Sequence, residues 1–213
     1  MSSLEYTLVE RPLIEQFTAM GWKHLEGAVH GAVIPMNPFA SGRTTFDETI
    51  LEDRLRDAIY KINLDSDGKP WLDDARIGSA VNALTRIPSS SLLEANQKAT
   101  DLLIKGTVVD GVQGWEGGKG RPVHFIDWKT PQNNEFTVVN QFRLDIPGTQ
   151  GKPIIPDMVL FVNGIPLVVV ECKEPRTSNL EKAVNQILDY AEQRPSDSRT
   201  GNQKLFTLCS SRS

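Results

Sequence analysis

The chain has 213 residues, of which 39% are hydrophobic and 23% are charged, and its formal net charge is −4. This composition is that of an ordinary globular protein and carries no overall basic signature of nucleic-acid binding, although a local basic patch is compatible with it. The longest apolar run, Ile165–Val170, is far too short to span a bilayer. The two cysteines, Cys172 and Cys209, form no disulfide framework, so we expect a cytoplasmic protein without membrane association.

Helical periodicity dominates the first half of the chain. We expect helices from Thr45 to Ile62 and over 10–21, 73–86 and 92–105, where apolar residues recur at helical spacing. Thr45 and Glu48 have the spacing of a capping box, which predicts the start of the second helix. A short strand is expected at 22–25, followed by a loop.

Strands are expected to dominate the second half. The pattern predicts strands over 107–109, 123–128, 135–146 and 204–209, a hairpin over 157–173 and a capped helix over 179–194. Within 135–146, alternation puts Val138 and Phe142 on one face, and Val139 and Gln141 on the other.

This order of elements predicts an α/β fold with a mixed central β-sheet flanked by helices and preceded by a mainly helical N-terminal segment. We expect a single domain over 1–213, as a fragment of a longer chain. Its mainly helical part would cover 1–106, and its sheet-bearing core 107–209.

The most informative stretch is the hairpin. Two apolar, β-branched runs flank Asn163-Gly164, and Asn-Gly between such runs is a strong hairpin signal because both residues accept positive φ. A hairpin brings its outer ends together. Asp157, at the start of the first strand, should therefore meet Glu171 and Lys173, at the end of the second.

The register of the hairpin decides whether these charges share a face. A strict two-residue loop pairs Val162 with Ile165 and leaves Asp157 and Glu171 on opposite faces. A three-residue loop or a bulge sets Asp157 directly across from Glu171 instead. If the charges form one site, we expect a longer loop, a bulge, or a bend at Pro156-Asp157.

Two neighbouring carboxylates and a lysine suit metal-assisted phosphodiester cleavage. Carboxylate oxygens are the ligands that Mg²⁺ prefers, and Mg²⁺ often takes only one or two of them and keeps several waters. A nearby lysine can orient the attacking water or stabilise charge in the transition state. Glu10 or Glu15 of the first predicted helix could add a further ligand, although exposed helix charge is the simpler interpretation.

A family resemblance rests on these residues. Pro156-Asp157 followed by Glu171-Cys172-Lys173 resembles the PD-(D/E)xK nuclease motif. Gln186 and Tyr190 resemble the Gln-x-x-x-Tyr motif of the RecB-like branch. With the stretches 125–128, 133–142 and 162–173, these residues look like the N-terminal nuclease domain of type I restriction enzyme R subunits. Cys172 is a small departure, since an apolar residue is more usual within Glu-x-Lys.

The resemblance implies a restriction-endonuclease-like core and Mg²⁺-dependent cleavage of double-stranded DNA, with Mn²⁺ able to replace Mg²⁺. It implies that Asp157 and Glu171 bind the metal and that Lys173 assists the attacking water. It also implies that Gln186 and Tyr190 orient the substrate or the lysine. The implied partners are modification and specificity subunits, together with motor domains of the same full-length chain that use ATP.

No nucleotide-binding motif is present in this chain. The glycine-rich segment 117–120 lacks both the earlier glycine of a phosphate loop and a Ser or Thr after its lysine. It is predicted to be a loop, so ATP is not expected to bind here.

Two other functions remain open at this point. The chain could be another nuclease of the same superfamily, such as a repair or junction-resolving enzyme, or a non-catalytic domain that docks the motor onto its partners. Basic residues that could meet DNA phosphates are Lys119, Arg121, Lys152, Arg176 and Lys182.

Overall fold

The computed structural model describes residues 5–27, 34–88, 91–112, 118–145 and 153–173, and the helical positions 181, 184, 185, 187 and 188. Its central element is a four-stranded mixed sheet of strand order β1-β4-β5-β6. The strands are β1 (Lys23–Glu26), β4 (Phe136–Asn140), β5 (Met158–Val162) and β6 (Ile165–Val170). β1 runs parallel to β4, whereas β5 is antiparallel to both β4 and β6. The predicted mixed sheet is therefore confirmed, and the strand predicted at 22–25 is β1, at one end of the strand order.

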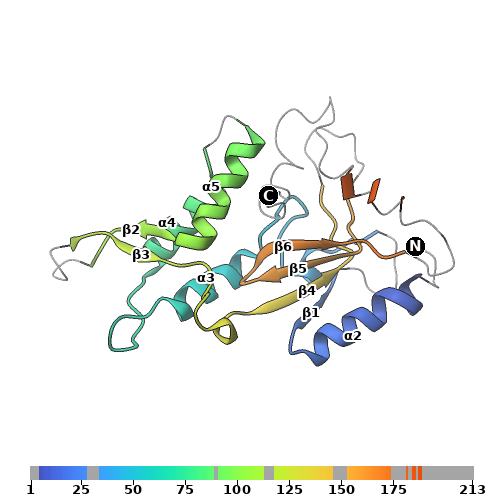
Figure 1. Ribbon diagram of the computed structural model, residues 1–213, viewed down its shortest axis with the longest axis horizontal. Helices are drawn as coiled ribbons and strands as arrows, with labels where there is room; N and C mark the ends of the chain where they lie inside the picture. Colours follow the sequence, from blue (N-terminus) through green and yellow to red (C-terminus); the bar gives the residue numbers. More distant parts are fainter. Residues whose placement is uncertain are drawn as a thin grey trace.

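Helices flank this sheet (Figure 1). The described helices are the π-helix η1 (Tyr6–Glu10), α2 (Arg11–Ala19), α3 (Glu52–Ile62), α4 (Asp74–Thr85), α5 (Leu92–Lys105) and the 3-10 helices η3 (Pro38–Ser41) and η5 (Pro131–Asn133). A separate antiparallel pair, β2 (Thr107–Val109) and β3 (Arg121–Val123), lies with α4 and α5 at the left of Figure 1. α2 lies beside β1, near the other end of the molecule. None of the helices in the described ranges is long and apolar enough to cross a membrane.

Alternation along the strands sends their side chains into separate buried clusters. On one face of the sheet, Ile14 of α2 packs against Val138, Met158, Leu160 and Cys172. On the other, a second cluster comprises Leu51, Val139, Phe142, Leu144, Ile154, Val159 and Phe161. A third cluster joins α3, α4 and α5 to the β2–β3 pair and reaches the hairpin at Ile165. The sheet is thus covered on both faces, and its strand ends are left to carry polar groups.

Local capping explains the helices that follow the sequence pattern. Asp73 accepts a hydrogen bond from the Arg76 amide at 2.9 Å and starts α4. Ser91 accepts one from the Glu94 amide at 3.2 Å and starts α5. α5 stops at Gly106, whose φ of 78° is favourable only for glycine.

The capping-box prediction at Thr45 is wrong. Thr45 does bond Glu48, but through the two side chains, at 3.3 Å, and α3 begins only at Glu52. The amide of Leu51 donates instead to the carbonyl of Gly164 in the hairpin turn, at 2.9 Å. This tertiary bond holds the chain in a non-helical conformation at Leu51, so the helix starts later than the local pattern predicts.

The predicted strand over 123–128 is also largely wrong. β3 ends at Val123, and Asp127 then accepts hydrogen bonds from the amides of Lys129 and Thr130 at 3.0 and 2.9 Å. These bonds form a local turn, which competes with strand pairing.

The predicted strand over 135–146 is shorter than expected. β4 ends at Asn140, because Gln141 adopts a φ of 49°. This left-handed residue reverses the alternation, and Phe142 packs with Val139 rather than with Val138. Leu144 then makes only an isolated bridge, to Ile154.

The predicted C-terminal elements lie mostly outside the described residues. Positions 181, 184, 185, 187 and 188 are helical, as the 179–194 prediction requires. Gln186 and Tyr190 lie outside the described residues, as does the predicted strand 204–209.

Candidate active site

A β-bulge sets the register of the hairpin. The turn residues Asn163 and Gly164 pair Val162 with Ile165, as in a two-residue loop. The register then shifts between Phe161 and Leu160, so that Met158 pairs with Val170. Beyond this pair, Asp157 stands across from Glu171. The bulge that the sequence required for a single site is therefore present.

Hydrogen bonds fix the Asp157 carboxylate on both oxygens. The amide of Cys172 donates to Oδ2 at 2.7 Å, and Nε2 of Gln141 donates to Oδ1 at 3.3 Å. Asp157 is only 9% exposed. The backbone of Gln141 also donates to the Asp157 carbonyl, at 2.7 Å. The side chain of Asp157 is thereby held at the junction of β4, β5 and β6.

Lys173 lies among the carboxylates. Its Nζ is 3.5 Å from Oε2 of Glu171 and 3.9 Å from Oδ2 of Asp157. Oε1 of Glu5 is 4.0 Å away. The structure therefore brings together Asp157, Glu171 and Lys173, the three charged residues that the hairpin argument predicted to converge.

Glu10 joins the cluster from η1. Its side chain is completely buried, and Oε1 accepts a 3.2 Å hydrogen bond from Nε2 of Gln141. Among the described residues, its other oxygen, Oε2, has no hydrogen-bond partner. Burial, and then the charge of Asp157, raise the pKa of Glu10 to about 7. Glu15, the alternative ligand, points elsewhere and forms an exposed pair with Arg11.

The chemistry of this cluster fits a hard divalent cation. Glu5, Asp157 and Glu171 lie within 4.0 Å of the Lys173 ammonium, and Glu10 is close enough to Asp157 for that charge to raise its pKa. Among the described residues, the site therefore carries an excess of negative charge whenever these carboxyls are ionised. A buried carboxylate oxygen without a partner is costly unless a cation or a proton meets it. Within the described ranges, however, no group of three or more His, Cys, Asp or Glu side chains has the spacing of a ready-made metal site. The arrangement suits Mg²⁺, which takes few protein ligands and keeps its waters.

The thiol of Cys172 takes no part in this chemistry. It is buried against α2, and burial followed by the charge of Asp157 raises its pKa to about 12. The thiol therefore stays protonated at neutral pH, and a protonated thiol is a poor ligand and nucleophile.

Two members of the cluster were not predicted from the sequence. Gln141 was assigned to a regular strand, on the face of Val139, and Glu5 precedes the first predicted helix. Neither has a local motif, because both reach the site only through the left-handed turn at Gln141 and the packing of η1. Glu10 was considered only as one of two alternatives.

The remaining predicted residues lie apart from the cluster or outside the described residues. Gln186 and Tyr190 are in the second class, as are Lys152, Arg176 and Lys182. Lys119 is exposed, and the guanidinium of Arg121 lies 5.1 Å from the ring centre of Trp71. Both belong to the β2–β3 part of the molecule.

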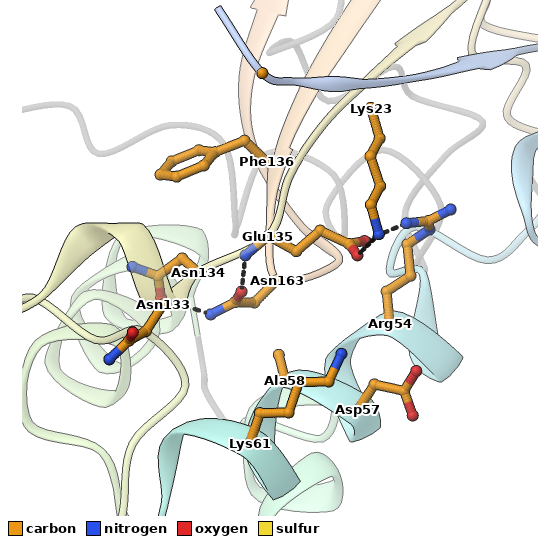
Figure 2. Close-up of a pocket in the computed structure, with 11 residues that line it drawn as sticks. Lys23, Arg54, Asp57, Ala58, Lys61, Asn133, Asn134, Glu135, Phe136 and Asn163 are labelled. Atoms are coloured by element: carbon orange, nitrogen blue, oxygen red, sulfur yellow. Dashed lines mark hydrogen bonds and ion pairs between the residues drawn. The ribbon is translucent and has the colours of Figure 1, made fainter.

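A second polar location lies at the opposite end of the strands. It is a pocket of ≈ 260 Å³ lined by Gly21, Lys23, Arg54, Asp57, Ala58, Lys61, Asn133, Asn134, Glu135, Phe136 and Asn163. Figure 2 shows the Glu135 carboxylate held by both Lys23 and Arg54, beside the turn residue Asn163. The acid at the centre of this pocket, Glu135, is thus already neutralised by two cations, as in a structural ion-pair network. The excess of negative charge is found at the Asp157 end instead.

Residues 2–210 match the model of the family described as the type I restriction enzyme R protein N terminus. The chain belongs to this family. The R protein N terminus therefore accounts for nearly all of the sequence, as the resemblance at the hairpin had indicated.

Relatives of this R protein N terminus carry consistent names. The type I restriction enzyme HindI endonuclease subunit of Haemophilus influenzae is 30% identical over 187 residues, which cover 87% of this chain and 16% of the relative. A protein of Methanocaldococcus jannaschii, provisionally named type I restriction enzyme MjaIXP endonuclease subunit, is 27% identical over 82% of this chain and 16% of its own length. The chain thus spans about 16% of the relatives that it matches.

Proposed function

We propose that this domain is the nuclease of a type I restriction enzyme R subunit and hydrolyses phosphodiester bonds of double-stranded DNA with Mg²⁺, or with Mn²⁺ in its place. The observation that carries the proposal is the convergence of Asp157, Glu171 and Lys173 across a bulged hairpin. Membership of the R protein family and the endonuclease names of its relatives support it.

Asp157 and Glu171 would hold the metal ion through their carboxylate oxygens, with the buried carboxylate of Glu10 as a further ligand. When bound, the ion supplies Lewis acidity at the phosphoryl oxygen. The Cys172 amide keeps one oxygen of Asp157 fixed, so the carboxylate is oriented before a ligand arrives. A preoriented ligand loses less conformational entropy on binding.

Lys173 would act on the reacting atoms. Its ammonium can orient the attacking water and donate a hydrogen bond to the phosphate oxygen on which charge develops. The water oxygen forms a bond to phosphorus, the bond from phosphorus to the leaving sugar oxygen breaks, and the leaving oxygen gains a proton to balance the one that the water loses. Gln186 and Tyr190 remain predicted to orient the substrate or Lys173.

The wider assembly is part of the same proposal. The domain would act in cis with motor domains that use ATP and move DNA, and in trans with modification and specificity subunits. No nucleotide is proposed to bind this domain. We propose that the complex works in the cytoplasm, where its DNA substrate is found.

Substitution of Lys173 tests this function. In the full-length protein with its partner subunits, Lys173→Ala should abolish cleavage while ATPase activity and translocation persist. Lys69→Ala, in the exposed turn 65–70, is a matched control because it also removes one lysine charge and should cleave normally. Undiminished cleavage by Lys173→Ala would refute the proposal and leave a docking role as the better explanation.

A further inference from the structure

Gln141 connects two acidic side chains that come from distant parts of the chain. Its Nε2 lies 3.2 Å from Oε1 of Glu10 and 3.3 Å from Oδ1 of Asp157. An amide nitrogen carries two hydrogens, so one donor is available for each carboxylate. The three side chains are buried, which strengthens both hydrogen bonds relative to bonds in water.

The backbone of Gln141 is what turns its side chain towards this position. With regular alternation, Gln141 would lie on the face of Val139, away from the helix that carries Glu10. Its φ of 49° breaks the alternation and places its side-chain amide next to Glu10. A left-handed glutamine is uncommon, and such strain persists where surrounding contacts hold it in place and is concentrated at functional sites.

Several contacts hold this strained backbone in place. The backbone amide of Gln141 donates to the Asp157 carbonyl. The backbone amide of Phe142 donates to the Pro156 carbonyl at 3.0 Å. The amide of Gly27 donates to the Asn140 carbonyl at 3.1 Å, and a side chain at Gly27 would collide with the backbone there. The turn is therefore fixed from both neighbouring strands.

We propose that Gln141 is a positioning residue of the metal site: its side-chain amide spans Glu10 and Asp157 and sets the separation of their carboxylates for a divalent cation. A carboxylate has about four lone-pair sites, so Asp157 can accept from Cys172 and Gln141 and still bind a metal ion. A neutral double donor suits this role, since it restrains two anions without competing for the cation's place. This inference rests on the proposed nuclease function.

Two variants separate positioning from a purely structural role. Gln141→Asn and Gln141→Gly both tolerate the left-handed backbone, and neither can span the two carboxylates. In the full-length protein, each should raise the Mg²⁺ concentration for half-maximal cleavage by about 10–100-fold, the usual effect of losing a residue that orients metal ligands. Cleavage should recover at saturating Mg²⁺. Titration calorimetry without DNA measures the affinity for Mn²⁺, which should fall by the same factor.

A neighbouring residue provides the matched control. Asn140 ends β4, and its side chain binds His24 at 3.0 Å and the Gly27 amide at 3.3 Å. Among the hydrogen bonds of the described residues, none joins this side chain to a carboxylate of the cluster. Asn140→Ala should lower thermal stability and leave the Mg²⁺ dependence unchanged. Asp157→Asn identifies the binding site: the part of the Mn²⁺ binding that this variant abolishes is assigned to the Asp157 cluster.

The outcomes distinguish this inference from the proposed function. An unchanged Mg²⁺ dependence in both Gln141 variants, with Lys173→Ala inactive, would overturn the positioning role alone. Normal cleavage by Lys173→Ala would overturn the nuclease proposal, while Mn²⁺ binding would still report on Gln141.

Discussion

The amide of Cys172 donates a 2.7 Å hydrogen bond to Oδ2 of Asp157, which joins the open ends of the hairpin by a side-chain bond. This bond is available only because Asp157 stands across from Glu171, the residue before Cys172. It therefore reports directly on the register that the bulge in β6 imposes.

Leu167 is the extra residue of this bulge, because Pro166 pairs with Phe161 and Val168 pairs with Leu160. Deleting Leu167 should restore a regular two-residue hairpin and move Asp157 out of register with Glu171. We expect the loss of metal binding and of DNA cleavage. Both can be measured on protein whose folded fraction is known from circular dichroism.

Leu167→Ala is the control for this deletion. It removes most of the same side chain, which packs against the cluster around Ile165, but it keeps the number of residues. The substitution should cost stability and preserve the metal dependence of cleavage. If the deletion and the substitution behave alike, the register is not what assembles the site.

The hairpin was predictable from sequence because its signals are local. Asn163-Gly164 specifies the turn, and the apolar runs specify the strands. The bulge was predictable only conditionally: sequence could say that Asp157 and Glu171 need one, but not that it forms. That choice depends on which face of β6 is buried by the rest of the fold.

The remainder of the site depends on tertiary contacts that no short pattern encodes. Glu10 reaches Asp157 because η1 and α2 pack on the face of the sheet that carries Val138. Gln141 fitted the pattern of an alternating strand. Its left-handed backbone was not predictable, because position 141 holds neither glycine nor asparagine, the residues that usually adopt this conformation. The start of α3 was mispredicted for a similar reason, since Leu51 is bound to the hairpin turn rather than to its own helix.

Asn163 should contribute strongly to stability. It is fully buried, and its side chain donates to the carbonyl of Phe125 at 2.9 Å and to Asn134 at 2.8 Å, and accepts from the amide of Glu135 at 2.7 Å. Asn163→Gly keeps the left-handed turn but removes all three hydrogen bonds, so we expect a loss of about 3 kcal/mol or more. Urea unfolding measures it. Asn133→Gly, an exposed neighbour with one side-chain bond to Asp127, should cost under about 1 kcal/mol.

Glu135 should matter for stability and not for cleavage. Burial raises the pKa of Glu135, but hydrogen bonds from Lys23 and Arg54 lower it by more and keep it below its ordinary value. A lowered carboxyl pKa stabilises the fold above the unfolded-state pKa, and this stabilisation is lost as the pH falls through the folded-state value. Glu135→Gln should therefore cost about 1 kcal/mol at pH 7, less at high salt, and nearly nothing at acidic pH. A large loss of cleavage in a folded Glu135→Gln protein would show that the pocket in Figure 2 contributes to function.

Glu10 should show the opposite dependence on pH. Its pKa is raised from 4.5 to about 7, so the folded state binds a proton more tightly than the unfolded state does. Stability without metal should then fall as the pH rises from about 4.5 to about 7 and stay reduced above that range. Glu10→Gln cannot ionise, so its free energy of unfolding in EDTA should exceed that of the parent protein at pH 8 by about 3 kcal/mol. The two proteins should be similar near pH 4.

Glu15→Gln is the matched control, since Glu15 is exposed on the following helix and paired only with Arg11 among the described residues. It should leave the pH dependence of unfolding unchanged. Adding Mg²⁺ at pH 8 should then stabilise the parent protein more than Glu10→Gln, because a ligand that binds only the folded state adds to its stability. Equal stabilisation of the two proteins by Mg²⁺ would remove Glu10 from the metal site and leave its buried carboxylate without a role in cleavage.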